Sequence, residues 1–378
     1  DALLMHDRPI RTRCDDSVAR VFAGAPYFLR RSRGYAPYPV RLPRDMPALL
    51  AVGAELKNVF ALTRGASAFL SHHIGDMENL PTLQAFEDGI EHLERLMRIR
   101  PEALAHDLHP DYLATRYALD RSEATGLPAL AVQHHHAHVA ACMADNGLDG
   151  DRPVIGVAFD GTGLGTDGAI WGGEILLADY RHCERRLHLG YVPLPGGDRA
   201  AREPWRMALA WLRCAGIDWE VDLPSVAAAP SAEALKVLRR QMEVGLNSPP
   251  TSSMGRLFDA AASLTGLRQQ SRFEAEAAMA LEAAVSPDET GAYDLDVGAS
   301  TIDARPMIAA MVADARAGTG IDRMAARFHN GVAWAVRAAC GAVRRDSSTR
   351  QVALTGGVWQ NAALLARTAT LLQEDGFD

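Results

Sequence analysis

The chain has few of the residues that mark secreted or membrane proteins. Its five cysteines are scattered over 378 residues and form no C-x-x-C pair. A disulfide framework and a thiolate zinc ribbon are therefore disfavoured, and a reducing cytoplasm is the expected compartment. No apolar run reaches the roughly 18–20 residues that a membrane span needs, and the N-terminus lacks the basic-then-apolar pattern of a signal peptide.

An excess of positive charge is also absent. The 47 Asp and Glu residues outnumber the 39 Lys and Arg residues, which gives a formal net charge of −8. Nucleic acid is therefore not expected as the main partner, because binding to phosphates requires a basic excess. Hydrophobic residues make up 48% and charged residues 23%, as in ordinary globular proteins, and the length suits two or three domains or one two-lobed domain. Because the chain begins without Met and ends just after an expected helix, we expect it to be part of a longer polypeptide.

The first 42 residues differ from the rest. The basic, aromatic and proline-rich run R-R-S-R-G-Y-A-P-Y-P at 30–39 predicts a loop or domain junction, because X-Pro steps favour extended backbone. After Pro43 the pattern alternates between strand and helix, which predicts an α/β fold.

The expected elements follow from hydrophobic periodicity and turn residues. In the first half they are strands at 48–54, at 59–70 with a turn at Gly65, at 103–108 and at 130–133, and helices at 82–99 and 134–146. In the second half they are strands at 154–159, 169–178 and 351–354, and helices at 203–215, 232–244, 255–265, 274–285, 305–316, 321–343 and 360–373.

The sharpest chemical signal is the run Q-H-H-H-A-H at 133–138. On a helix, His134 and His138 are four residues apart, so both imidazoles project from one face and can share a metal ion. Imidazole nitrogens suit Zn or Fe, and further ligands must come from elsewhere in the chain. A surface histidine cluster is the alternative. The glutamate that an H-E-x-x-H peptidase uses as its base is missing, which disfavours a metalloprotease.

A second signal is D-G-T-G-L-G-T-D-G at 160–168. It places the Asp160 carboxylate at the end of a buried strand, and glycines such as Gly163 permit close approach of the backbone to a ligand. An ordinary hairpin loop is the alternative. Because the run leads into a strand and not a helix, it is not a dinucleotide-binding fingerprint.

Three further motifs are weaker. In T-G-G-V-W-Q-N at 355–361, Gly356 and Gly357 join a strand to a helix, which favours an anion site or simply a tight turn. In S-S-M-G-R-L-F-D at 252–259, a serine is expected to cap a helix, and Asp259 suits a ribose diol or solvent. The run P-L-P-G-G-D-R with R-E-P-W-R, at 193–206, could hold an anion through its arginines or be a structural loop.

Together these runs resemble the HypF family of hydrogenase-maturation carbamoyltransferases. They match its C-terminal Kae1-like module, which has the two-lobed ASKHA (actin, sugar kinase, Hsp70) α/β fold, from about Pro43 to the end. Residues 1–42, with H-D-R-P-I, D-D-S-V and R-R-S-R-G-Y-A-P, resemble the tail of the preceding YrdC-like domain. The resemblance implies a tail and linker at 1–42, lobe I at 43–152 and lobe II at 153–378, with lobe II incomplete at its C-terminus.

The resemblance also implies an activity. In the family, carbamoyl phosphate is hydrolysed by an acylphosphatase domain, and the YrdC-like domain couples the carbamate to ATP to give carbamoyl-adenylate. The Kae1-like domain then transfers the carbamoyl group to the C-terminal cysteine of the partner HypE, as a precursor of the cyanide ligands of [NiFe]-hydrogenase. This chain would be the cytoplasmic transfer module, with no role in membranes and no catalytic cysteine of its own.

Carried over by motif, the resemblance implies a divalent Zn or Fe ion held by His134, His138 and Asp160, with a fourth ligand in an N-D-G-G run that lies beyond this sequence. The implied nucleotide contacts are Gly163, Gly356, Gly357, Asn361, Asp259 and Glu274.

Three other functions stay open at this stage. Two keep the fold and change the acceptor, to tRNA in threonylcarbamoyl transfer or to a small hydroxyl compound in O-carbamoylation. The third is a non-catalytic ATP-binding scaffold, which would bind nucleotide without a metal at His134 and His138.

Overall fold

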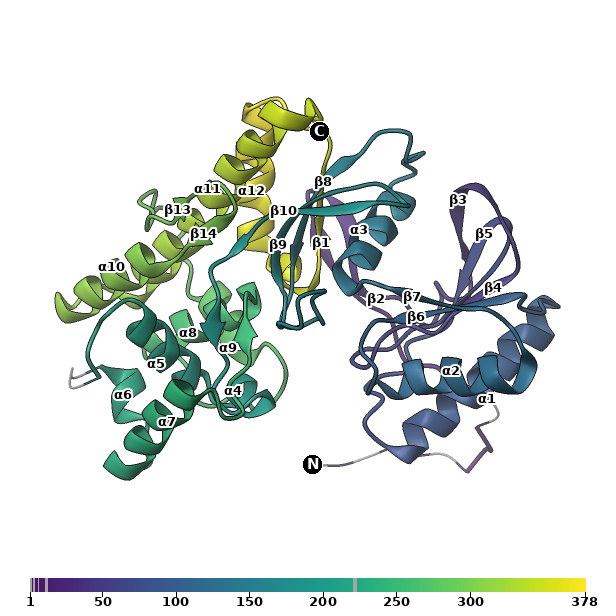
Figure 1. Cartoon of the computed structure of the whole chain (residues 1–378), viewed down its shortest axis with the longest axis horizontal. Coiled ribbons are helices and arrows are strands. Elements are labelled where there is room, and N and C mark those ends of the chain that lie inside the picture. Colours follow the sequence, from purple (N-terminus) through teal and green to yellow (C-terminus); the bar gives the residue numbers. More distant parts are fainter. Residues whose placement is uncertain (1, 3, 6, 11–12, 220–222) are drawn as a thin grey trace. The chain divides into compact units, whose positions relative to one another are not determined.

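The computed structural model describes residues 2, 4–5, 7–10, 13–219 and 223–378. They divide into two compact units, drawn in Figure 1. The first contains the chain up to Val132 together with Ala144–Asp149, and the second contains Gln133–Met143 together with the chain from Gly150 onward. In the described part of the chain, no helix has the length and apolar character that crossing a bilayer requires.

The first unit begins with a β-hairpin that the sequence pattern did not predict. Strands β1 (Val18–Phe22) and β2 (Ala25–Arg30) pair antiparallel around a two-residue turn in which Ala23 and Gly24 both have positive φ. Most hairpin side chains are exposed or half-exposed, so the sequence shows no clear apolar alternation. The loop predicted for the proline-rich run lies between β2 and β3 (Pro39–Met46).

A five-stranded sheet forms the centre of the first unit, in the order β3-β5-β4-β6-β7. Strands β4 (Leu49–Ala51), β6 (Ala103–Asp107) and β7 (Ala129–Val132) are parallel, and β5 (Ala61–Leu70) is antiparallel to β3 and β4. Helix α1 (Leu80–Met97) confirms the predicted helix, whereas α2 (Leu113–Thr125) was missed because its apolar face is weak. The core of the unit includes Leu50, Phe60 and Phe86.

The turn predicted at Gly65 is wrong. Strand β5 runs through this residue without a break, and Gly65 adopts a φ of 56° beside a register shift in the pairing with β3. Glycine within a strand marks such an irregularity as readily as a turn, and the sequence does not distinguish the two.

The second unit contains a six-stranded sheet in the order β13-β14-β10-β9-β8-β15. Strand β8 (Val154–Phe159) is fully buried, pairs antiparallel with β9 (Gly173–Ala178), and pairs parallel with β15 (Val352–Thr355). The remaining strands are β10 (Cys183–Leu189), β13 (Asp296–Val297) and β14 (Thr301–Asp303). A separate pair is formed by β11 (Val192–Pro193) and β12 (Pro250–Thr251).

The helices of this unit follow the predicted ranges closely. They are α3 (His134–Asp145, whose last two residues belong to the first unit), α4 (Asp198–Arg202), α5 (Pro204–Cys214), α6 (Pro224–Ala227), α7 (Ala232–Val244), α8 (Met254–Leu264), α9 (Glu276–Ala283), α10 (Arg305–Arg316), α11 (Ile321–Ser347) and α12 (Ala362–Glu374). The short α4 and α6 were not predicted. The helix predicted at 360–373 begins two residues later, because Gln360 belongs to a 3₁₀ turn, η1 (Gly357–Gln360), and Asn361 is the N-cap of α12.

Helix α8 lies at the centre of the second unit. All of its residues are buried, and Ser253 caps its N-terminus by accepting a hydrogen bond from the Arg256 amide. Of the two serines that the sequence offered as caps, Ser253 is therefore the one used. Because α8 is buried on every side, its charged residues need hydrogen-bonding partners other than bulk water.

Candidate functional site

The structure brings His134, His138 and Asp160 together. Nε2 of His138 lies 3.0 Å from the Oδ2 atom of Asp160, and Nε2 of His134 lies 3.9 Å from the same oxygen. One ligand-type atom from each residue falls within 4.8 Å of the other two. Among the described residues, this is the only group of three or more His, Cys, Asp or Glu side chains arranged in this way.

Two imidazole nitrogens and one carboxylate oxygen are a donor set that suits Zn or Fe. The three side chains are between 16% and 34% exposed, so the group is accessible and not sealed in the core. Burial raises the pKa of Asp160, but hydrogen bonds from His134 and His138 outweigh it and hold this pKa well below the ordinary value. An ionised carboxylate beside two imidazoles fits a divalent cation, and these residues would hold one.

Local packing explains why α3 presents these histidines at the end of β8. Gln133 precedes the helix, and its Oε1 accepts a hydrogen bond from the His136 amide. Val139 of α3 packs directly on the backbone of Gly156 in β8. A Cβ on Gly156 would lie 2.4 Å from Cγ2 of Val139, so this close contact requires glycine. At the other end of the contact, the Thr355 hydroxyl donates to the carbonyl oxygen of His138.

Gly163 is needed for close packing against the histidines. A Cβ at this position would lie 2.5 Å from Cε1 of His135 and 2.9 Å from Cδ2 of His134. The predicted nucleotide contact of Gly163 stays a prediction, but its contact with the imidazoles gives a second reason for glycine here.

The other two histidines of the run, His135 and His136, make different contacts. His135 is fully buried, and burial together with the neighbouring histidines lowers its pKa well below the ordinary value, so it is neutral. The ring of His136 makes a 2.7 Å hydrogen bond with the carbonyl oxygen of Asp179, after β9.

The Gly356–Gly357 turn lies directly beside Asp160. Gly356 has a φ of 98°, and a Cβ on it would lie 2.3 Å from the carbonyl oxygen of Phe159. A Cβ on Gly357 would lie 3.2 Å from Oδ1 of Asp160. Gly356 is therefore required for β15 and η1 to pass so close to the end of β8, and at Gly357 a side chain would be tight against Asp160.

Asn361 is buried, and its amide makes two hydrogen bonds inside the protein. Its Oδ1 accepts a hydrogen bond from the Leu364 amide and caps α12, and its Nδ2 lies 2.8 Å from Nε2 of His329. Burial lowers the pKa of His329 to about 4, so this ring is neutral and can accept that hydrogen bond. The Ala362 amide donates to Glu282. The predicted phosphate contact of Asn361 stays a prediction, and the structure shows a cap that fixes the glycine turn.

The N-terminus of α8 also lies against Asp160. The carbonyl oxygen of Asp160 accepts hydrogen bonds from the Gly255 amide (3.0 Å) and the Ser253 hydroxyl (2.8 Å). One turn further on, Asp259 is 2% exposed, and burial raises its pKa to about 6, with the nearby Glu274 raising it further and Arg256 lowering it. Glu274 is thus near enough to influence the pKa of Asp259, and the predicted nucleotide contacts of both residues stay predictions.

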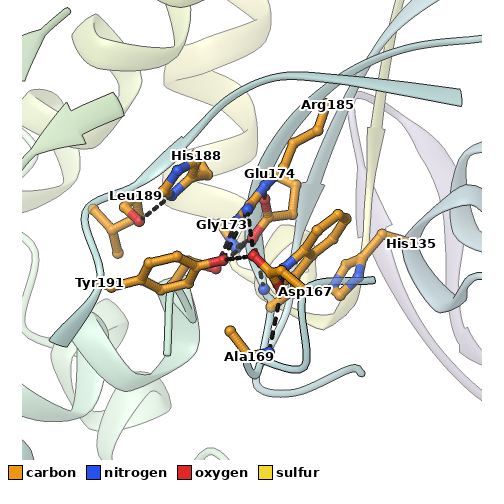
Figure 2. A network of polar contacts seen from close by, with 12 residues as sticks. His135, Asp167, Ala169, Gly173, Glu174, Arg185, His188, Leu189 and Tyr191 are labelled. Carbon is orange, nitrogen blue, oxygen red and sulfur yellow. Dashed lines mark hydrogen bonds and ion pairs between the residues drawn. The ribbon is translucent and has the colours of Figure 1, made fainter. Parts of the chain in front are cut away.

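The sequence analysis did not predict a cluster of side chains near His134, His138 and Asp160, the three residues that we call the metal-type group (Figure 2). Glu174 of β9 is fully buried and pairs with Arg185 of β10 at 2.5 Å. Arg185 also contacts Asp167 and Tyr191, and its guanidinium lies over the ring of Trp171. Asp167 accepts a hydrogen bond from the Trp171 indole. This cluster connects the glycine-rich loop to β9 and β10.

Two arginines of the motif at 193–206 are held by an acid of the same motif. Glu203 pairs with Arg199 at 2.9 Å and also with Arg206. Of the two possibilities left open by the sequence, these contacts favour the structural loop.

Two family models match the sequence. Residues 44–145 match the HypF Kae1-like domain, and residues 156–378 match the second subdomain of the carbamoyltransferase Kae1-like domain. The second match alone spans more than half of the chain.

Curated relatives agree with the family models. The chain is 44% identical over 383 residues to the carbamoyltransferase HypF of Rhizobium leguminosarum bv. viciae, covering 100% of this chain and 48% of the relative. It is 42% identical over 403 residues to HypF2 of Cupriavidus necator, covering 96% and 48%. The chain therefore spans about half the length of these relatives.

Solved structures share the fold. A crystal structure of full-length HypF in the phosphate- and nucleotide-bound form matches with a TM-score of 0.89 and 38% identity, over 99% of this chain and 58% of that one. The structure of HypF from T. kodakarensis matches with a TM-score of 0.87 and 31% identity, over 97% and 49%. The α/β fold is thus the predicted two-lobed Kae1-like fold, and the chain belongs to the HypF carbamoyltransferase family.

Proposed function

We propose that this chain is the carbamoyl-transfer module of a HypF enzyme. Its donor would be carbamoyl-adenylate, made from carbamoyl phosphate and ATP by other parts of the whole protein. Its acceptor would be the C-terminal cysteine of a HypE-like protein, in the cytoplasm. The observation that carries the proposal is the position of Asp160, which lies within reach of both histidines and of the Gly356–Gly357 turn.

His134, His138 and Asp160 would hold the divalent metal ion. A bound Zn or Fe ion would supply Lewis-acid polarisation of an oxygen of the donor. The neutral His135 and the Gly163 backbone pack against His134 and restrict the orientation of its ring.

The nucleotide part of the donor would lie along the segments that surround Asp160. The Gly357 and Val358 amides open the η1 turn and would bind phosphate oxygens. Gly163 and Asn361 would make further contacts with the nucleotide. Asp259 and Glu274 would hold the ribose hydroxyls. Backbone donors fixed by buried packing stabilise the charge of the leaving group without reorganising.

The attacking thiol would come from the partner. Cys340, the fully buried cysteine of this chain, has its pKa raised by burial to about 12, so it stays protonated at neutral pH. Burial also raises the pKa of Cys214. Neither residue belongs to the group around Asp160.

The experiment is the intact mass of a HypE-like protein after incubation with the full-length enzyme, ATP and carbamoyl phosphate. We expect a carbamoyl adduct that disappears when the terminal cysteine of the acceptor is replaced, and also with the H134A enzyme. The exposed His182 serves as the matched control, because H182A should leave the adduct unchanged. No adduct with enzyme that has bound metal and nucleotide would contradict the HypE-like acceptor and favour a small hydroxyl acceptor.

A further inference from the structure

One buried ion pair of the second unit lacks the hydrogen bonds that such pairs normally make. Nη1 of Arg256 lies 2.9 Å from Oδ2 of Asp259, one turn along α8, but the two groups are not oriented for a hydrogen bond. Within the described part of the chain, Nε and Nη1 of Arg256 and Oδ2 of Asp259 are all buried and without a hydrogen-bond partner.

This arrangement is costly unless a ligand completes it. Nearly all buried polar groups in proteins are hydrogen-bonded, and an unsatisfied charged donor is more costly than a neutral one. The Arg256 side chain is 11% exposed, so the guanidinium is largely withdrawn from water that could satisfy it. Nη1 keeps its contact of 2.9 Å with Asp259, so Nε is the donor left for a partner that binds from outside the chain.

The position of the guanidinium indicates which partner. Nε, which has no hydrogen-bond partner, and Nη2 form one edge of the planar guanidinium. A Cβ on Gly161 would lie 3.3 Å from Nη2, so this edge borders the backbone that follows Asp160. The Gly161 amide itself donates to Oδ1 of Asp160, the atom that Gly357 approaches. Arg256 thus lies at the meeting point of the metal-type group and the glycine turn.

An arginine edge with two parallel donors matches the geometry of phosphate and carboxylate oxygens. Of these, a phosphate is the anion that the proposed nucleotide donor brings to this turn. We infer that Arg256 binds the phosphate of the adenylate through Nε and Nη2, while Asp259 holds Nη1 and keeps the group aligned. This inference rests on the proposed nucleotide site and adds to it the cation that neutralises the phosphate of donor and leaving group.

The inference separates nucleotide from nucleoside binding. If Arg256 contacts the phosphate, its removal weakens AMP and leaves adenosine, which lacks the phosphate, almost unaffected. If Arg256 only supports the fold around the ribose, both ligands weaken together.

The test is isothermal titration calorimetry of the full-length protein with AMP, adenosine and inorganic phosphate. We expect the wild-type protein to bind AMP more tightly than adenosine, and R256Q to lose at least tenfold in AMP affinity with adenosine affinity changed less than twofold. R345Q removes the same charge from an exposed position of α11 and should change neither.

Several outcomes would overturn the inference. They are a folded R256Q protein with wild-type AMP affinity, equal losses for AMP and adenosine, or inorganic phosphate binding as tightly as AMP. If R256Q does not fold, R256K decides, because lysine keeps the charge but not the two-donor edge, and unchanged AMP affinity in R256K would also overturn it. Failure of the wild-type protein to bind either nucleotide or nucleoside would instead contradict the proposed function itself.

Discussion

Two buried arginine–carboxylate pairs in the second unit differ in how completely they are hydrogen-bonded. In the first pair, Oε1 of Glu174 accepts hydrogen bonds from the Gly172 and Gly173 amides and the Ser252 hydroxyl, and Oε2 accepts one from Arg185. In the second pair, Arg256 and Asp259 leave three polar atoms without a hydrogen bond. The first is complete within the chain and acts as scaffold, whereas in the second Nε of Arg256 is left for the phosphate that we infer to bind there.

The location of the two pairs agrees with this difference. Glu174 and Arg185 join neighbouring strands of the sheet, where every partner comes from the fold itself (Figure 2). Arg256 and Asp259 lie on one helix, beside the turn that leaves β8 for the metal-type group. Charged pairs in a protein interior therefore indicate function through the donors and acceptors they leave unused, more than through burial alone.

The largest expected effect on stability comes from removing Glu174 of the complete pair. The E174A change leaves Arg185 with a buried charge and without its main partner, so we expect a loss of about 3–5 kcal/mol in the free energy of unfolding. Urea denaturation measures this loss. The matched control is E243A, because Glu243 is 37% exposed and pairs with Arg213 at 3.7 Å, and its free energy of unfolding should fall by less than about 1 kcal/mol. Similar losses at both positions would contradict the scaffold role.

Replacing Asp259 tests the incomplete pair through pH. Because its folded pKa is raised to about 6, its stabilising contribution is full below the unfolded value of 3.8 and is lost as pH rises through 6. The D259N protein lacks this loss. We therefore expect D259N to match the wild type near pH 4 and to be more stable by about 3 kcal/mol at pH 7.5, without ligand.

The measurement is urea denaturation of both proteins across this pH range. A difference in stability that does not change with pH would show that Asp259 is not held in a raised-pKa environment. The same variant should bind AMP more weakly, because Arg256 loses the carboxylate that aligns it.

The smallest expected effect on stability comes from Tyr191, a partly exposed neighbour of the pair formed by Glu174 and Arg185. The Tyr191 hydroxyl accepts a 2.8 Å hydrogen bond from Arg185 and donates one to Asp167. Because Tyr191 is 37% exposed, Y191F should cost only about 1 kcal/mol of stability. Nucleotide titration of this variant should give wild-type AMP affinity, and a tenfold loss would place the scaffold cluster inside the binding site.

Local sequence spacing predicted the part of the site that depends on single segments. The i, i+4 spacing of His134 and His138, and Asp160 at the end of an apolar run, could be identified without any knowledge of tertiary contacts. The structure places these three side chains together, and their role as metal ligands remains a prediction. Most helices of the second unit were predicted for the same reason, because their apolar periodicity is local.

Features that depend on pairing between distant segments could not be predicted. Strand β10 reads as a polar stretch, C-E-R-R-L-H-L, because only one side of it faces the core. The partnership of Arg185 with Glu174 follows from the register of β10 on β9, which no local pattern specifies. The motif around Asp259 was identified, but the lack of hydrogen bonds on Arg256 is visible only when its neighbours are in place.

The most direct test of the account is the metal content of the purified full-length protein, measured by elemental analysis. Asp160 is the residue that joins the metal-type group to the glycine turn, so the account predicts close to one more Zn or Fe ion per chain in the wild-type protein than in D160N. It predicts strongly reduced metal in D160N and H138A, and wild-type metal in the exposed control H182A. Wild-type metal content in both D160N and H138A would contradict the account.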